Sequence, residues 1–106
     1  MEVKVNARDG ELTDAVKETI ESKVSKLPRF LERTTAIQVI ADLKHDEPKV
    51  EIILSAEGAS DFFASDSGAN VLAALDTNIA KMEQQLRKYK EKITAHRDRH
   101  GSSQSG

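Results

Sequence analysis

Basic side chains recur at helical spacing in two segments of this 106-residue chain. In the first segment they stand three residues apart. In the second they stand seven and four residues apart on one helix face, with two more beside them. The residues are Lys23, Lys26 and Arg29 in the first segment, and Lys81, Lys88, Lys92, Arg87 and Lys90 in the second. Such rows suit contact with a phosphate backbone, which needs several cations but no reading of bases. The pattern therefore predicts polyanion binding.

A second interpretation of these cations is structural, because positive charge near a helix C-terminus complements the helix dipole. It accounts for Lys26 and Lys92 but not for Lys81, which falls in the middle of its predicted helix. The net charge of −2 is also unevenly placed, since residues 81–100 carry +4 and residues 1–80 carry −6. A basic C-terminal fifth indicates directional contact with a polyanion or a well-solvated helix face. The sequence leaves both interpretations open.

The sequence contains few patterns of residues that could perform catalysis or bind a metal or cofactor. The absence of cysteine excludes disulfides, thiol catalysis, thiolate zinc sites and iron–sulfur clusters. The glycines form no phosphate-binding loop, and no serine lies in a nucleophile elbow. His96 and His100 are four residues apart, but Arg97 and Arg99 beside them repel a metal ion. We therefore expect no enzyme activity, no metal, no cofactor and no small-molecule substrate.

The hydropathy pattern indicates no membrane partner. No apolar run approaches the roughly 20 residues of a membrane span. The first residues lack the charged and then apolar order of a signal peptide. We expect a cytosolic protein of full native length.

The elements that would position the basic rows follow from periodicity. Alternating apolar residues predict a first strand and, after a helix, three strands joined by short polar turns. Thr13 is a typical helix N-cap, and Pro28 disfavours continuation of the helix. The predicted elements are a strand at 3–7, a helix at 13–27 and strands at 35–43, 50–54 and 61–64.

The strongest periodic signal lies in the last third of the chain. Seven apolar residues alternate at spacings of three and four, which predicts one amphipathic helix from Asn70 to Ala95, opened by Asp66-Ser67-Gly68. Packing on the sheet is favoured over a coiled coil, because the strands need a cover for one face. The apolar residues are Leu72, Leu75, Ile79, Met82, Leu86, Tyr89 and Ile93.

The order β-α-β-β-β-α predicts a two-layer α+β domain. A four-stranded sheet would carry both helices on one face, and the first strand would be parallel to the strand after the helix. We expect one domain over residues 1–95 and a flexible polar tail over residues 96–106.

The ordered set of motifs along residues 1 to about 95 resembles the ribosome hibernation-promoting factors. This family is also called the ribosome-associated inhibitor, protein Y or sigma-factor modulation family. The similarity covers the domain with little gapping. The residues that carry it are Glu11-Leu12-Thr13-Asp14-Ala15-Val16, Lys23-Val24-Ser25-Lys26-Leu27, Ala73-Ala74-Leu75-Asp76 and the run from Lys81 to Lys92.

The resemblance implies a fold like that of double-stranded-RNA-binding domains. It implies binding to rRNA of the small ribosomal subunit, and so to the whole ribosome, in the channel used by mRNA and by tRNA at the A and P sites. The ribosome is then held inactive during stress or stationary phase, with other hibernation factors as further candidate partners. The implied rRNA-facing positions are Lys23, Lys26, Arg29, Lys81 and Lys88, with Arg87, Lys90 and Lys92 in support.

Three features set this chain apart from the family's pattern. Gln84 stands where an Arg is frequent, and Leu72 stands where a Tyr is frequent. The chain also stops before the C-terminal dimerisation domain of long members, so the resemblance implies the short form.

Two rival functions use the long helix differently. A protein-binding regulator would present an exposed part of the Leu86–Tyr89–Ile93 stripe to a protein target. A coiled-coil oligomeriser would pair the same heptads between copies of the chain.

Overall fold

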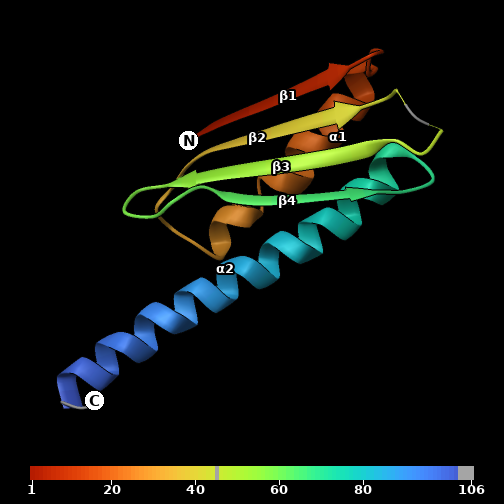
Figure 1. The fold of residues 1–106 in the computed structure, drawn as a ribbon. Helices are drawn as coiled ribbons and strands as arrows, with labels where there is room; N and C mark the ends of the chain where they lie inside the picture. Colours follow the sequence, from red (N-terminus) through yellow and green to blue (C-terminus); the bar gives the residue numbers. More distant parts are fainter. Residues whose placement is uncertain (45, 103–106) are drawn as a thin grey trace.

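The chain folds as one four-stranded sheet with two helices and a short 3-10 helix, in the order predicted (Figure 1). The structure, a computed structural model, describes residues 1–44 and 46–102, with side chains as far as Ile93. The elements are β1 (Glu2–Arg8), α1 (Asp14–Val24), the 3-10 helix η1 (Leu27–Arg29), β2 (Thr34–Asp42), β3 (Lys49–Ala56), β4 (Phe62–Ser67) and α2 (Val71–Ser102).

The strands lie in the order β1-β2-β3-β4, so neighbours in sequence are neighbours in the sheet. β1 is parallel to β2, with Val5 opposite Val39, because α1 forms the crossover between them. β2, β3 and β4 form an antiparallel meander, in which Val39 faces Ile52 and Ile52 faces Ala64. The predicted fold class and strand directions are confirmed.

Both helices cover the same face of the sheet, as expected. Alternate residues of β2 and β3 point towards the helices and are fully buried, among them Val39 and Ile52. Ile20 of α1 and Leu75 and Met82 of α2 meet them in one core. Aliphatic burial of this kind supplies most of the stabilisation of a small domain.

α1 begins where predicted and ends three residues early. The Val16 N–H donates to Thr13 Oγ1 at 3.1 Å, which confirms Thr13 as the N-cap. The helix was expected to reach residue 27 but stops at Val24. Pro28 has no N–H to donate, and the chain tightens into η1, where the Phe30 N–H donates to the Leu27 carbonyl at 2.9 Å.

The start of α2 corrects a second expectation. Asp66 and Ser67 do not open the helix, because they extend β4 along β3. The cap is Asn70, whose Oδ1 accepts from the Ala73 N–H at 2.8 Å. Gly68 lets the chain turn closely against the helix, since a Cβ there would lie 2.9 Å from the Ala74 nitrogen.

α2 projects beyond the sheet (Figure 1). It continues past the expected end at Ala95 to Ser102, because residues 71–100 contain no proline or glycine. The molecule consequently measures 54 × 25 × 17 Å. Residues 103–106 of the predicted tail lie outside the described residues. Over the part of the chain that is described, no helix combines the length and apolar character of a membrane span.

Candidate nucleic-acid interface

The two basic rows lie on neighbouring elements of the helical layer, and we call their eight residues together the basic surface. The Lys23 ammonium at the end of α1 lies 2.9 Å from Asp76 Oδ1 on α2. The Arg87 guanidinium of α2 lies over the ring of Phe30, directly after η1. These contacts place the end of α1 and η1 beside α2. The eight residues of the basic surface are Lys23, Lys26, Arg29, Lys81, Arg87, Lys88, Lys90 and Lys92.

Lys81 is held to the edge of the sheet. Its Nζ lies 3.0 Å from Asp66 Oδ2 and donates to the Ser65 carbonyl at 3.4 Å. The hydrogen bond from Lys81, together with that from the Ser67 N–H, lowers the pKa of the Asp66 carboxyl. Asp66 therefore stays ionised beside the ammonium at neutral pH.

Among the described side chains, the other six cations of the basic surface have no such partner. Each is exposed, and among side chains described up to Ile93 none has a carboxylate oxygen within 4 Å. Their charge is therefore available to an external anion. These residues, which we call the open cations, are Lys26, Arg29, Arg87, Lys88, Lys90 and Lys92.

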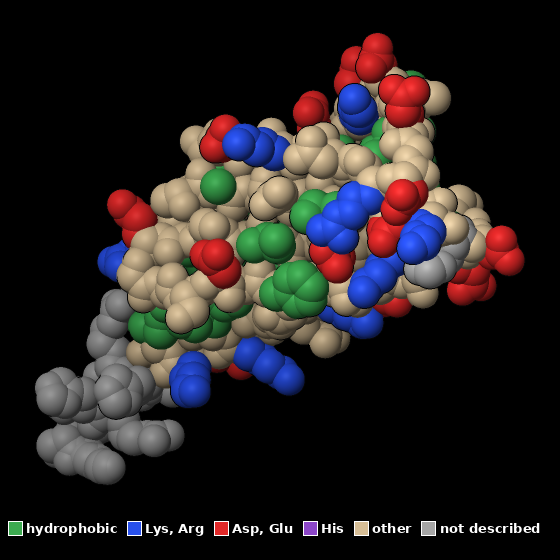
Figure 2. Space-filling view, turned by 45° about the horizontal axis from the view of Figure 1, so that its top comes forward, with side chains coloured by type: hydrophobic (Ala, Val, Ile, Leu, Met, Phe, Trp, Pro, Cys, Tyr) green, Lys and Arg blue, Asp and Glu red, His purple; other side chains and the backbone are tan. Residues whose placement is uncertain are grey.

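The face of the sheet that no helix covers has a different character. Its cations are matched by carboxylates, with Lys49 and Arg8 lying 3.8 and 3.9 Å from Glu51. Figure 2 shows apolar patches and both signs of charge mixed over the upper part of the molecule, and basic side chains along the lower edge, where α2 runs. Among the described side chains, the helical layer thus carries the larger number of cations without a carboxylate partner.

Most of the apolar stripe of α2 is buried in the core. Leu75, Met82 and Leu86 are fully buried, so they are unavailable to a partner helix. Tyr89 is half-buried and meets Phe62 edge to face, with ring centroids 5.2 Å apart. The expectation that α2 packs on the sheet is confirmed for this stripe. A protein-binding regulator would need an exposed part of the stripe from Leu86 to Ile93, and Leu86 is buried and cannot belong to it.

The two positions that depart from the family's pattern differ in burial. Gln84 is exposed on α2, so the row has a neutral amide there. Leu72 is half-buried and packs against the core. The neighbouring Gln85 donates through Nε2 to the Phe63 carbonyl at 2.8 Å and ties α2 to β4.

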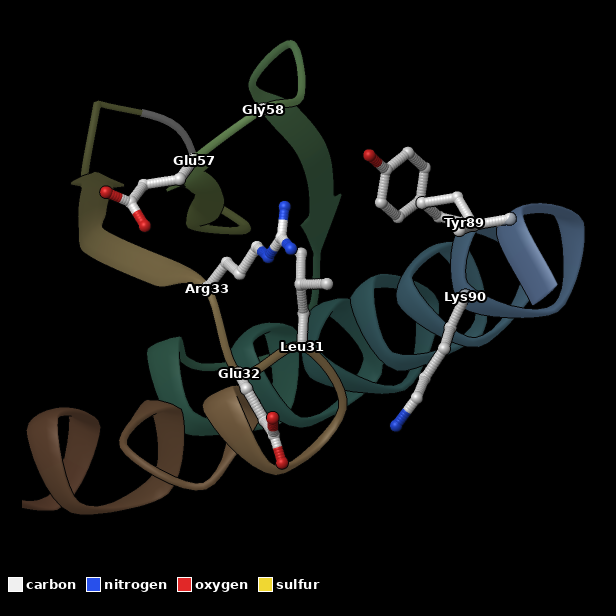
Figure 3. Close-up of a pocket in the computed structure, with 8 residues that line it drawn as sticks. Leu31, Glu32, Arg33, Glu57, Gly58, Tyr89 and Lys90 are labelled. Atoms are coloured by element: carbon white, nitrogen blue, oxygen red, sulfur yellow. The ribbon is translucent and has the colours of Figure 1, made fainter. Parts of the chain in front are cut away.

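A pocket of about 420 Å³ lies at the end of the basic surface (Figure 3). It is bounded by the α1–β2 connection, the β3–β4 turn and α2. The Arg33 guanidinium and the Tyr89 hydroxyl point towards the space beside Gly58, whereas Lys90 and Glu32 point to the other side (Figure 3). Arg33 was not among the predicted site residues, because it lies beyond the three-residue steps of the first row.

No group of histidines and carboxylates able to hold a metal ion occurs among the described residues. The side chains of His96 and His100 lie outside that range.

Solved structures share this fold. The crystal structure of the protein Y N-terminal domain of Thermus thermophilus aligns with a TM-score of 0.74 and 24% identity, covering 84% of this chain and 99% of that one. A ribosomal subunit interface protein of Coxiella burnetii aligns with the same score and 22% identity, covering 86% and 99%. These likenesses confirm the α+β architecture.

Sequence relatives carry a common description. The ribosome hibernation promoting factor of Azotobacter vinelandii is 34% identical over 92 residues, which cover 87% of this chain and 85% of the relative. The factor of the same description from Escherichia coli K12 is 27% identical over 96 residues, covering 91% and 100%. The family described as sigma 54 modulation protein / S30EA ribosomal protein matches residues 3–94. The chain therefore belongs to the sigma 54 modulation protein / S30EA ribosomal protein family.

Proposed function

We propose that this chain is a ribosome hibernation factor that binds rRNA of the small subunit and inhibits translation by occupying the decoding channel. The observation that carries the proposal is the set of six open cations on the elements of the helical layer. Membership of the family, and the description shared by its relatives, support the ribosome as the partner.

The mode of binding follows from the side chains. Lysine and arginine on rigid helices supply phosphate contacts without the loss of freedom that a flexible tail would suffer. Such contacts position the protein on RNA by shape rather than by base sequence. Occupancy of a channel would then suffice for inhibition, with no chemical step.

The test compares two charge-reversal variants that change the net charge equally. Lys26→Glu with Lys88→Glu removes two open cations, and Lys4→Glu with Lys49→Glu changes the uncovered sheet face. Each purified protein is sedimented through sucrose with small subunits and whole ribosomes at two salt concentrations. Translation is then measured in a cell-free extract.

We expect the parent chain and the sheet-face variant to sediment with small subunits and to inhibit translation. The helix variant should bind at least tenfold more weakly, because it loses two phosphate contacts and adds two repulsive charges. Equal binding by both variants would show that the helical layer is not the interface. Failure of the parent chain to bind at low salt would reject the ribosome as its partner.

A further inference from the structure

Two lysines of the basic surface are already engaged by carboxylates of the same chain. Lys23 of α1 lies 2.9 Å from Asp76 of α2, and Lys81 of α2 lies 3.0 Å from Asp66 of β4. Each pair joins two different elements. We call Lys23 and Lys81 the paired lysines.

These carboxylates lie where a phosphate would have to bind. A phosphate oxygen that approaches the Lys81 ammonium to hydrogen-bonding distance also approaches the Asp66 carboxylate, and like charges repel at that range. The same holds for Asp76 beside Lys23. An incoming phosphate must either displace the carboxylate or share the lysine with it.

The two carboxylates contribute little to the stability of the fold. Asp76 is 59% exposed, and an exposed ion pair adds little to stability; Asp66 is 22% exposed, but its partner Lys81 is 52% exposed, so water still reaches that pair. Asp66 also accepts the Ser67 N–H at 2.9 Å, a bond that an asparagine oxygen can keep. Replacement by asparagine therefore removes the charge and leaves the local hydrogen bond.

We propose that Asp66 and Asp76 are internal competitors for phosphate, which lower the affinity of the basic surface for polyanions. The paired lysines are then recruited only by an RNA whose phosphates are fixed where they can replace the carboxylates. The inference rests on the proposed function, because it concerns the same surface. It assigns to these two acidic residues a role in selecting the ligand.

The experiment measures binding of a fluorescently labelled 20-nucleotide poly(U) RNA by anisotropy, over a series of KCl concentrations. Asp66→Asn and Asp76→Asn are compared with Asp61→Asn. Asp61 is exposed, immediately precedes β4, and has no cation within 4 Å among the described side chains. All three variants lose one negative charge, so the control removes the effect of net charge.

We expect Asp66→Asn and Asp76→Asn each to bind poly(U) about threefold more tightly than Asp61→Asn at low salt. The slope of log affinity against log salt should steepen by about 0.7 for each lysine released to the RNA. The gain from Asp66→Asn should vanish when Lys81→Gln is added and persist when Lys88→Gln is added instead. Melting curves of every variant check folding, and Asp76→Asn, on an exposed helix face, tests the idea independently of Asp66.

Each outcome has a distinct meaning. If the parent chain binds poly(U) and Asp61→Asn matches the other two variants, the competitor role is overturned. A gain that survives Lys81→Gln would also overturn it for Asp66. If the parent chain binds neither poly(U) nor small subunits, the proposed function itself fails.

Discussion

The guanidinium carbon of Arg87 lies 5.2 Å from the centre of the Phe30 ring. This cation–π contact joins α2 to the residue directly after η1, and so holds η1, which carries Arg29, beside α2. An arginine that rests on a ring also loses less freedom when it binds a phosphate. Phe30 thus bears on binding although it carries no charge.

Replacement of Phe30 by leucine tests this relationship. Leucine keeps an apolar side chain against the core but removes the ring. We expect binding to small subunits to weaken two- to threefold, and the free energy of unfolding to fall by about 1–2 kcal/mol. Sedimentation and urea denaturation measure the two effects. The loss of binding should disappear in an Arg87→Gln background, and its persistence there would show that the ring acts otherwise.

The ion pair between Asp66 and Lys81 predicts a pH dependence of stability. The folded state lowers the pKa of Asp66 below its unfolded value of about 3.9. Between these two pKa values the unfolded chain binds a proton that the folded chain does not, so stability falls as pH falls. The contribution is complete above the unfolded pKa and is lost below the folded one.

The comparison is between the parent chain and Asp66→Asn, in urea at pH 7 and at steps down to pH 2. We expect the parent chain to be the more stable at pH 7 and the difference to shrink below about pH 4. Asp61→Asn serves as the control and should show no comparable convergence. A difference that stays constant down to pH 2 would refute the linkage.

Asn78 is the one fully buried polar side chain among the described residues. Its Nδ2 donates to the Val50 carbonyl at 2.8 Å and links α2 to β3. Asn78→Asp would place a negatively charged carboxylate next to the Val50 carbonyl oxygen, at a position that water does not reach. We expect it to lower the free energy of unfolding by about 3 kcal/mol or more at pH 7, and by less at pH 5, where protonation relieves the charge. Asn6→Asp, on the exposed part of β1, should change stability by less than about 0.5 kcal/mol in the same urea experiment.

Much of the architecture could be predicted from the sequence because each element has a clear period. The stripe through Leu75, Met82 and Leu86 predicted a helix packed on the sheet, and all three are fully buried. Thr13 was correctly predicted as a cap, since a cap depends on neighbours within three residues. The second basic row lies on α2 as predicted, but of the first row only Lys23 lies in α1, because Lys26 falls in the turn before η1 and Arg29 in η1.

The features that were missed depend on contacts between distant residues. Asp66 and Ser67 were interpreted as the opening of a helix, because polar residues before an apolar run are typical caps. Their place in β4 depends on pairing with β3. The Lys23–Asp76 pair spans 53 positions, and no local spacing indicates it. Asn78 lies beside the apolar stripe of α2. At such a position the residue type alone does not indicate whether the side-chain amide is buried or exposed to water.

The two layers of this domain also determine how it can be observed. The basic surface belongs to the helical layer, and Ser67 at the end of β4 is exposed on the uncovered face of the sheet. The chain contains no cysteine. Ser67→Cys would therefore give a single thiol for a fluorophore, placed on the face away from the basic surface, so that a bound protein could be followed without blocking its own contacts.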